Sequence, residues 1–188
     1  MSPRYTWLWV TLALGLFAFI FLFERHWREV VPEPLRVLPA LNLASITSVQ
    51  VRPAGQLEIR AERTDGGWWL TRPLSYPGEA AQIEALLTNL TQLQVQIHIT
   101  AAELRQHTNT DEEFGLDLPQ ASLLLQERDR RHQLLVGART PPGDQVYLQV
   151  VGIEGLYVVS ADLLRHIPQS PGAWRETRLA DLERPGFD

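Results

Sequence analysis

The segment DGGWWLTRPLSYPGEAAQIEALLTNLTQL, residues 65–93, decides the fold because it holds a turn, a strand and a helix in succession. Its Asp-Gly-Gly start is a strong hairpin signal between two apolar runs. If residues 66–73 form a strand, Trp68 and Trp69 point to opposite faces, so one enters the core and the other faces outward. After the Pro-Gly pair, Ile and Leu recur at i, i+3, i+4 and i+7, which predicts a helix with one apolar stripe.

The sequence around this segment predicts further strands. Residues 46–53 and 56–63 alternate apolar and polar positions, and with the tryptophan strand they make a three-stranded meander. This alternation places Leu57 on the same face as Ile59. Residues 95–99 predict one more strand after the helix.

The second half of the chain repeats this plan of strands followed by a helix. Its predicted strands are 121–127, 132–138, 145–151 and 155–160. Ser160 is placed to cap the closing helix, and Thr100–Glu103 and Thr110–Glu113 each fit a capping box for a short helix. The predicted fold class is α+β: an N-terminal transmembrane helix, then a domain of two antiparallel β-meander-plus-helix modules.

The run YTWLWVTLALGLFAFIFLF, residues 5–23, is uncharged and long enough to cross a bilayer. At about 1.5 Å per residue it spans roughly 28 Å as a helix. A cleaved signal peptide is the alternative, but its apolar part is usually about 7–15 residues long and ends at small residues. We therefore predict an uncleaved anchor, with tryptophans near both ends as in an aromatic belt. The predicted anchor residues are Trp7, Trp9, Phe17, Phe21 and Trp27.

These elements divide the chain into seven predicted parts. They are a tail (1–4), the transmembrane helix (5–23), a proline-containing spacer (24–45), the first module (46–100), a short helical connector (101–120), the second module (121–180) and a C-terminal tail (181–188). Arginines flank both ends of the anchor, but the very short first tail favours a cytoplasmic N-terminus. We expect a single-pass protein of the bacterial inner membrane whose C-terminal domain is periplasmic.

The composition argues against several kinds of chemistry. All 17 basic residues are arginine, and the chain has no lysine and no cysteine, which excludes lysine Schiff bases, disulfides and cysteine zinc sites. The net charge of −5, without an arginine-rich aromatic face, argues against a nucleic-acid partner. The sequence contains no nucleophile elbow and no phosphate-binding loop, and its five histidines are scattered. We expect no catalytic residues, no metal, no cofactor and no enzyme activity.

Five residues are candidates for contact with a partner: Trp69, Pro141, Pro142, Asp144 and Tyr147. The Pro-Pro-Gly-Asp loop is either a rigid turn or an exposed contact loop. The tryptophan pair is either packing or part of a binding site, and strand alternation favours packing for one of the two.

Several of these motifs together resemble the family called domain of unknown function 4340. The resemblance extends over roughly residues 46–180. It rests on a Trp-x-Leu-x-x-Pro strand, a Gly-Leu-Asp-x-Pro hinge, a strand ending in Gly, a Pro-Gly turn into a Tyr strand, and a closing Tyr strand and helix. Here these are Trp68, Leu70 and Pro73; Gly115, Leu116, Asp117 and Pro119; Gly137; Gly143 and Tyr147; and Tyr157.

The resemblance implies a membrane-anchored envelope protein, since relatives are often associated with ABC-type export systems and gliding-type auxiliary proteins. It supplies no catalytic residues. We expect a non-enzymatic accessory or assembly subunit of a larger membrane complex, whose partners are integral membrane subunits and the lipid bilayer. The alternative is a tethered periplasmic ligand-binding or sensing domain, although a small-molecule ligand is the less expected partner.

Overall fold

The computed structural model describes Ala13, Leu14, Leu16, Phe17, Phe19 and residues 35–176. The predicted transmembrane helix lies largely outside this set, as do Trp7, Trp9, Phe21, Trp27 and both predicted tails. Phe17 is helical and 68% exposed. Within the described residues, no helix is both long and apolar enough to cross a bilayer. The chain divides into two compact units, 1–34 and 35–188, and the sheet and its helices belong to the second.

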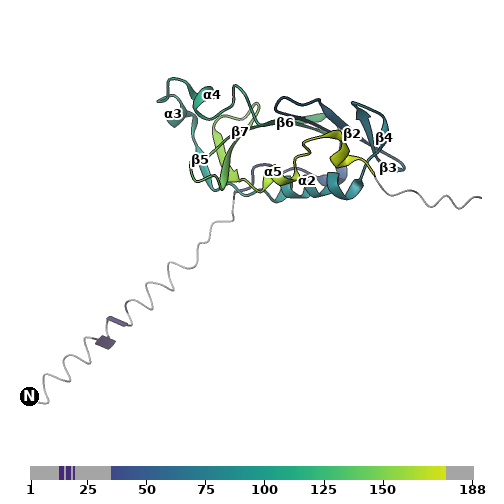
Figure 1. Ribbon diagram of the computed structural model, residues 1–188. Coiled ribbons are helices and arrows are strands. Elements are labelled where there is room, and N and C mark those ends of the chain that lie inside the picture. Colours follow the sequence, from purple (N-terminus) through teal and green to yellow (C-terminus); the bar gives the residue numbers. More distant parts are fainter. Residues whose placement is uncertain (1–12, 15, 18, 20–34, 177–188) are drawn as a thin grey trace, which may run out of the picture. The chain divides into compact units, whose positions relative to one another are not determined.

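The described part of this second unit contains one antiparallel sheet in the order β4-β3-β2-β1-β6-β7-β8-β9-β5 (Figure 1). The strands are β1 (Ile46–Pro53), β2 (Ile59–Thr64), β3 (Gly67–Arg72), β4 (Tyr76–Pro77), β5 (Ile97–Ile99), β6 (Ala121–Glu127), β7 (Arg130–Arg139), β8 (Gln145–Val150) and β9 (Leu156–Ser160). The helices are α2 (Ala80–Gln92), α3 (Ala101–Leu104), α4 (Thr110–Glu113) and α5 (Leu163–His166), with 3₁₀ turns at Leu43–Ser45 and Pro171–Trp174. The α+β class is therefore confirmed.

The two predicted meanders join into this single sheet because β1 pairs with β6 along almost its whole length. Helix α2 carries the chain beneath the sheet, and the strand that follows it pairs with β9 at the far edge, where Ile97 lies opposite Val158 (Figure 1). Residues 97–99, which the sequence groups with the first module, thus extend the second meander.

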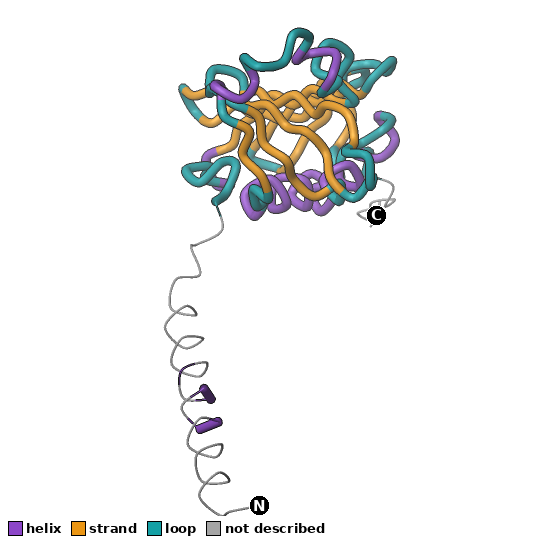
Figure 2. The backbone as a smooth tube through the Cα atoms, turned by 90° about the vertical axis from the view of Figure 1, so that its left-hand side faces the viewer, coloured by secondary structure: helices purple, strands orange, loops and turns teal. Residues whose placement is uncertain are grey.

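The main core lies between the inner face of the sheet and helices α2 and α5, and Figure 2 shows the strands arching over α2. Helix α2 buries its predicted stripe completely, because Ile83, Leu86, Leu87 and Leu90 are all 0% exposed. The two tryptophans separate as alternation requires: Trp68 is 4% exposed and Trp69 is 40% exposed.

Three local predictions need correction. Leu57 is 68% exposed, because β2 begins only at Ile59 and Leu57 lies in the preceding loop. Thr110 is the first residue of α4 rather than its cap, and no side chain caps that helix. Ser160 lies too early to cap α5, which begins at Leu163; its hydroxyl accepts a hydrogen bond from the Asp162 N–H instead.

The predicted cap of α3 is confirmed. The Thr100 hydroxyl accepts from the Glu103 N–H at 3.3 Å, and the Glu103 carboxylate accepts from the Thr100 N–H at 2.7 Å. These reciprocal bonds satisfy two backbone donors that a helix start would otherwise leave unpaired.

Candidate functional site

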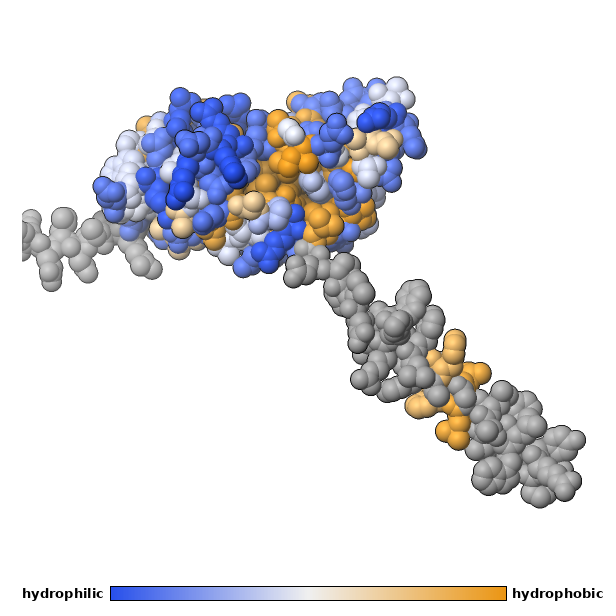
Figure 3. All heavy atoms as spheres, turned by 180° about the vertical axis from the view of Figure 1, so that it is seen from behind, coloured by the Kyte–Doolittle hydropathy of each residue, from blue (hydrophilic) through white to orange (hydrophobic). Residues whose placement is uncertain are grey.

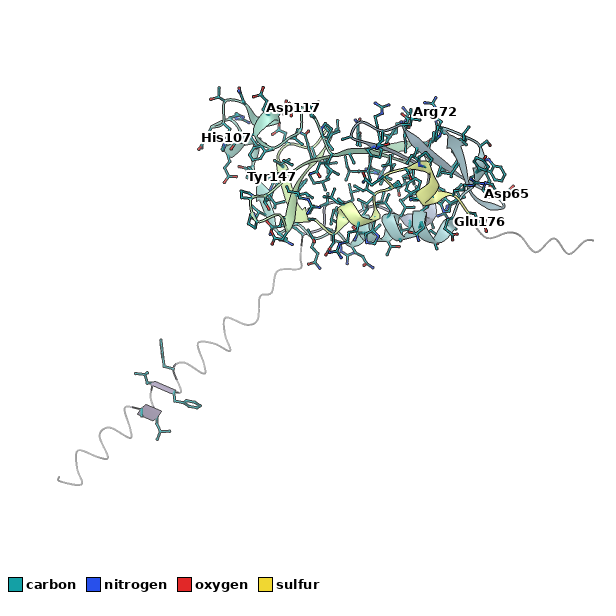
Figure 4. All side chains as sticks on the ribbon, in the orientation of Figure 1. Asp65, Arg72, His107, Asp117, Tyr147 and Glu176 are labelled. Atoms are coloured by element: carbon teal, nitrogen blue, oxygen red, sulfur yellow. The ribbon has the colours of Figure 1, made fainter. Side chains whose placement is uncertain are left out.

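The predicted contact residues do not assemble into one site. Trp69 lies on β3 and Tyr147 on β8, with β2, β1, β6 and β7 between them. At about 4.8 Å per strand, this separates their strands by roughly 24 Å along the sheet. Figure 4 shows the same distribution, with Arg72 of β3 and Tyr147 at opposite ends of the domain. The two aromatic residues therefore belong to different surfaces.

The Pro-Pro-Gly-Asp segment forms a braced turn between β7 and β8. Gly143 has φ of +83° and its N–H donates to the Thr140 carbonyl at 2.8 Å. The Arg139 guanidinium donates to the Gly143 carbonyl at 2.8 Å. Pro141, Pro142 and Asp144 are exposed on this turn. The geometry is that of a rigid turn. A partner that contacts this turn would therefore meet it in one fixed conformation.

Tyr147 takes part in packing on the outer face of the sheet, the face opposite α2. Its ring meets the Phe114 ring edge-on, with centroids 4.7 Å apart. Phe114, Leu116 and Leu156 form a second, smaller core there, against which Tyr147 is half-buried. Tyr147 therefore holds the connector of residues 101–120 against β8 and β9, and its predicted contact with a partner stays a prediction.

Close backbone contact seats this connector. The Ala138 N–H donates to the Phe114 carbonyl at 2.7 Å, next to a register shift in β7. A Cβ on Gly137 would lie 2.2 Å from that carbonyl oxygen, and a Cβ on Gly115, which has φ of +66°, would lie 2.8 Å from the Ala138 nitrogen. Both glycines are required because any side chain would push the two backbones apart. This contact explains why the Gly-Leu-Asp-x-Pro hinge and the strand glycine occur together in one pattern.

Among the described residues, the connector covers only the β7–β9 half of the outer face, and no described helix lies over the half formed by β2, β1 and β6 (Figure 1). Cross-strand register places polar side chains there in rows, such as Trp69 beside Glu62 and Glu62 beside Ser48. We call this surface the open face. Its residues are Ser48, Gln50, Arg52, Glu58, Arg60, Glu62, Trp69, Arg72, Ser122, Leu124, Gln126 and Arg131.

A β-bulge brings Arg72 to the open face. Strict alternation would put Arg72 on the same side as the buried Leu70, but the pairing with β2 shifts between Arg60 and Ala61. A bulge adds one residue to one strand and so reverses the alternation beyond it. The Arg72 guanidinium consequently reaches Glu58 at 3.0 Å. The sequence does not predict that Arg72 lies on this face, because a bulge leaves no sign in the alternation of apolar and polar residues.

Ion pairs organise the charged part of the open face. Glu58 accepts from Arg52 at 2.7 Å and from Arg72 at 3.0 Å. The hydrogen bond from Arg52, with the positive charges of both arginines, holds the pKa of the Glu58 carboxyl below its ordinary value despite its burial. Arg60 binds Glu62 at 2.9 Å. The Trp69 indole N–H donates to the Ser75 hydroxyl at 2.8 Å, which fixes the ring at the rim.

A second polar cluster lies at the buried end of β6 and was not among the predicted sites. The Glu127 side chain is 11% exposed, and its Oε1 accepts from the Ser45 hydroxyl at 2.7 Å and from the Asn42 N–H at 3.2 Å. Its Oε2 lies 3.1 Å from His132 Nε2. The Ser45 hydrogen bond, followed by those from His132 and Asn42, lowers the pKa of Glu127. One sequence signal existed: alternation in ASLLLQE puts this glutamate on the buried face.

The remaining candidates for chemistry are dispersed. Among the residues that the structure describes, no group of three His, Asp or Glu side chains is placed to hold a metal ion. His107 pairs with Glu113 at 2.7 Å on the surface, and His98 stacks on Tyr157 with centroids 5.0 Å apart. A hollow of about 330 Å³ lies beside Arg139, lined also by Ala54, Gln120, Ala121, Leu164 and Gln169.

These features define an α+β domain with one covered sheet face, one half-covered face and an exposed polar surface with a tryptophan at its rim. The family model described as domain of unknown function (DUF4340) matches residues 68–187, from the first strand tryptophan through the closing helix. The chain belongs to this family. The first two strands and their turn precede the matched region, although the resemblance in the motifs began at residue 46. Comparison with curated proteins and with solved structures gives no match.

Proposed function

We propose that this protein is a non-enzymatic accessory or assembly subunit of a larger membrane complex, and that the open face binds a partner subunit. In this proposal the N-terminal segment anchors the protein in the bacterial inner membrane and the domain is periplasmic. An ABC-type transport system is the complex we favour, because relatives that the motifs resemble are often associated with such systems.

The observation that carries the proposal is the open face itself. An antiparallel sheet buries its apolar face and can leave its polar face to solvent or to a partner; here α2 and α5 cover the apolar face, and among the described residues the connector covers half of the other. Tryptophan and arginine are enriched at protein interfaces and at their energetic centres. Trp69 is already oriented by its bond to Ser75, so binding would cost little additional side-chain entropy.

The test replaces Trp69 in the full-length protein. Trp69→Ala should weaken partner recovery from mild-detergent extracts about 30-fold, the effect of losing an interface hot spot of about 2 kcal/mol. The melting temperature should change little, because Trp69 is exposed and its neighbours stay packed.

Leu118→Ala is the matched control, since Leu118 is also a large exposed side chain, at 83%, but lies on the connector. Recovery of the same partners by wild type and Trp69→Ala would contradict the assignment of this face. Recovery of wild type only as a lone monomer would contradict the subunit role itself.

One observation favours the ligand-binding alternative. The hollow beside Arg139, which also braces the Pro-Pro-Gly-Asp turn, has Gln120 and Gln169 among its lining residues, so its lining includes polar side chains. Trp69 does not line this hollow, so in this alternative the ligand would bind beside Arg139 and away from the tryptophan pair. Arg139→Gln should then abolish a ligand-induced rise in melting temperature while leaving partner recovery intact.

A further inference from the structure

The charges on the open face differ in sign from the protein as a whole. The chain has a net charge of −5. Among the described side chains of the open face, arginines outnumber glutamates by four to two; they are Arg52, Arg60, Arg72 and Arg131, with Glu58 and Glu62. Seen from behind, hydrophilic side chains gather over the end of the domain that carries β2, β3 and β4 (Figure 3). A locally positive surface on an acidic protein selects its partners by charge.

The cationic groups project further than the carboxylates that pair with them. The side chains of Arg52 and Arg72 are 64% and 61% exposed, whereas that of Glu58, which both contact, is 13% exposed. One carboxylate therefore lies at the floor between two outward guanidinium groups, and it neutralises only one of the two charges. An approaching partner meets arginine first.

Arg60 adds a further guanidinium to the same surface. Its Nη2 binds Glu62 at 2.9 Å, but its Nε–H is buried and has no hydrogen-bond acceptor. A guanidinium binds a carboxylate best through two parallel N–H groups. The Nε–H itself is out of reach of a partner, but the side chain as a whole is 39% exposed, so the outer N–H groups of this guanidinium are accessible to a further carboxylate.

We propose that the open face binds an acidic protein segment, with carboxylates on the arginines and an apolar residue against Trp69. This inference rests on the proposed function and specifies the chemistry of its partner. The centre of the face supports a peptide: the side chains of Ser48 and Gln50 offer both donors and acceptors. An excess of two positive charges matches a segment with a few carboxylates. Double-stranded DNA carries one charge about every 1.7 Å, which needs a longer basic surface.

The experiment identifies what touches the centre of the face. Gln50 of β1 is half-buried and lies between β2 and β6. In the experiment it is replaced by the photo-crosslinking residue p-benzoylphenylalanine, in the full-length protein in native membranes. Mass spectrometry of the crosslinked product should give a peptide rich in Asp and Glu from another subunit. A neutral or basic peptide, a lipid, a nucleic acid or no product would overturn the inference.

Salt and charge reversal provide the second measurement. Crosslinking should fall at least fivefold at about 1 M salt, where the Debye length is about 3 Å. Arg72→Glu should reduce it at least tenfold at low salt, and Arg72→Gln by a smaller factor. Arg165→Glu is the control: it makes the same charge change on an 83% exposed side chain of α5, the helix that covers the opposite face of the sheet, and it should not affect crosslinking.

The outcomes separate the two levels of the proposal. If detergent co-purification recovers a partner that depends on Trp69 but the crosslink ignores salt and Arg72→Glu, the acidic-segment inference fails and the subunit role stands. If partners are recovered but none depends on Trp69, the open face is not the binding surface and the acidic-segment inference fails with it; if wild type is recovered only as a lone monomer, the subunit role fails as well. Circular dichroism of each variant confirms that a lost crosslink reflects binding, and Arg72→Gln provides the reading if Arg72→Glu does not fold.

Discussion

Replacing Glu127 with alanine should destabilise the domain through the polar cluster that fixes residues 42–45 to the sheet. The carboxylate accepts from Ser45 and Asn42 and contacts His132, across sequence separations of 82, 85 and 5 residues. Hydrogen bonds to charged groups contribute about 1.5–3 kcal/mol each, and the alanine variant leaves the Asn42 N–H without an acceptor. In the variant the single Ser45 hydroxyl proton can be donated to the Asn42 carbonyl, 2.8 Å away, so the loss there is partial.

These terms give an expected decrease of about 2–3 kcal/mol in the free energy of unfolding, because the Glu127 side chain is only 11% exposed and solvent weakens its bonds little. For a domain of this size that corresponds to a fall of about 4–12 °C in melting temperature. Urea unfolding of the full-length protein in detergent, followed by tryptophan fluorescence, measures it. Glu62→Ala is the control; its carboxylate is 40% exposed and paired with Arg60, so the change should stay below about 1 kcal/mol.

The pH dependence gives this prediction a sign. The folded-state pKa of Glu127 lies below the ordinary value of 4.5, so its contribution to stability is complete above that pH and is lost as the pH falls through the folded pKa. The stability difference between wild type and Glu127→Gln should therefore be larger near pH 7 than near pH 3. An alanine variant within about 0.5 kcal/mol of wild type, or a difference that grows toward acid, would refute the reasoning.

The remaining predictions concern the connector. Gly137→Ala should lower the free energy of unfolding by about 3 kcal/mol or more, because its Cβ would lie 2.2 Å from the Phe114 carbonyl oxygen. Hydrogen exchange at the Ala138 amide, which donates to that carbonyl, should accelerate. Gly66→Ala is the control and should be tolerated, because a Cβ on Gly66 meets no atom within 4 Å. Tyr147→Ala should cost about 2–3 kcal/mol through the lost Phe114 contact, whereas Tyr147→Phe should stay within about 0.5 kcal/mol. Equal thermal stability of the two Tyr147 variants would show that the ring does not hold the connector.

Much of the fold followed from local patterns. Alternation correctly predicted that one tryptophan enters the core and the other faces outward, although the structure was needed to show that Trp68 is the buried one; helical spacing identified the buried stripe of α2. The Thr100–Glu103 capping box formed as expected because both partners lie within one helical turn. Leu57 was misplaced because alternation shows which residues share a face but not where a strand begins.

The candidate site was less predictable from the sequence. Trp69 was found, but the arginines beside it come from β1, β2 and β3, and no spacing in the sequence indicates that they share a surface. The packing of Tyr147 was not foreseen, because Phe114 reaches it from the connector 33 positions earlier in the chain; its role as a contact residue stays a prediction. The Pro-Pro-Gly-Asp turn is braced as expected of a rigid turn, and its partner role stays a prediction.

The sequence by itself determined most of the strands, the helix α2 with its buried stripe, and the family, since side-chain periodicity and turn chemistry act over a few residues. Only the tertiary structure decided that β1 joins β6, that β5 moves to the far edge, and that a bulge turns Arg72 outward. The physical reason is that strand pairing and backbone docking minimise exposed apolar area and unpaired backbone groups over the whole domain. The open face is what that global arrangement leaves uncovered.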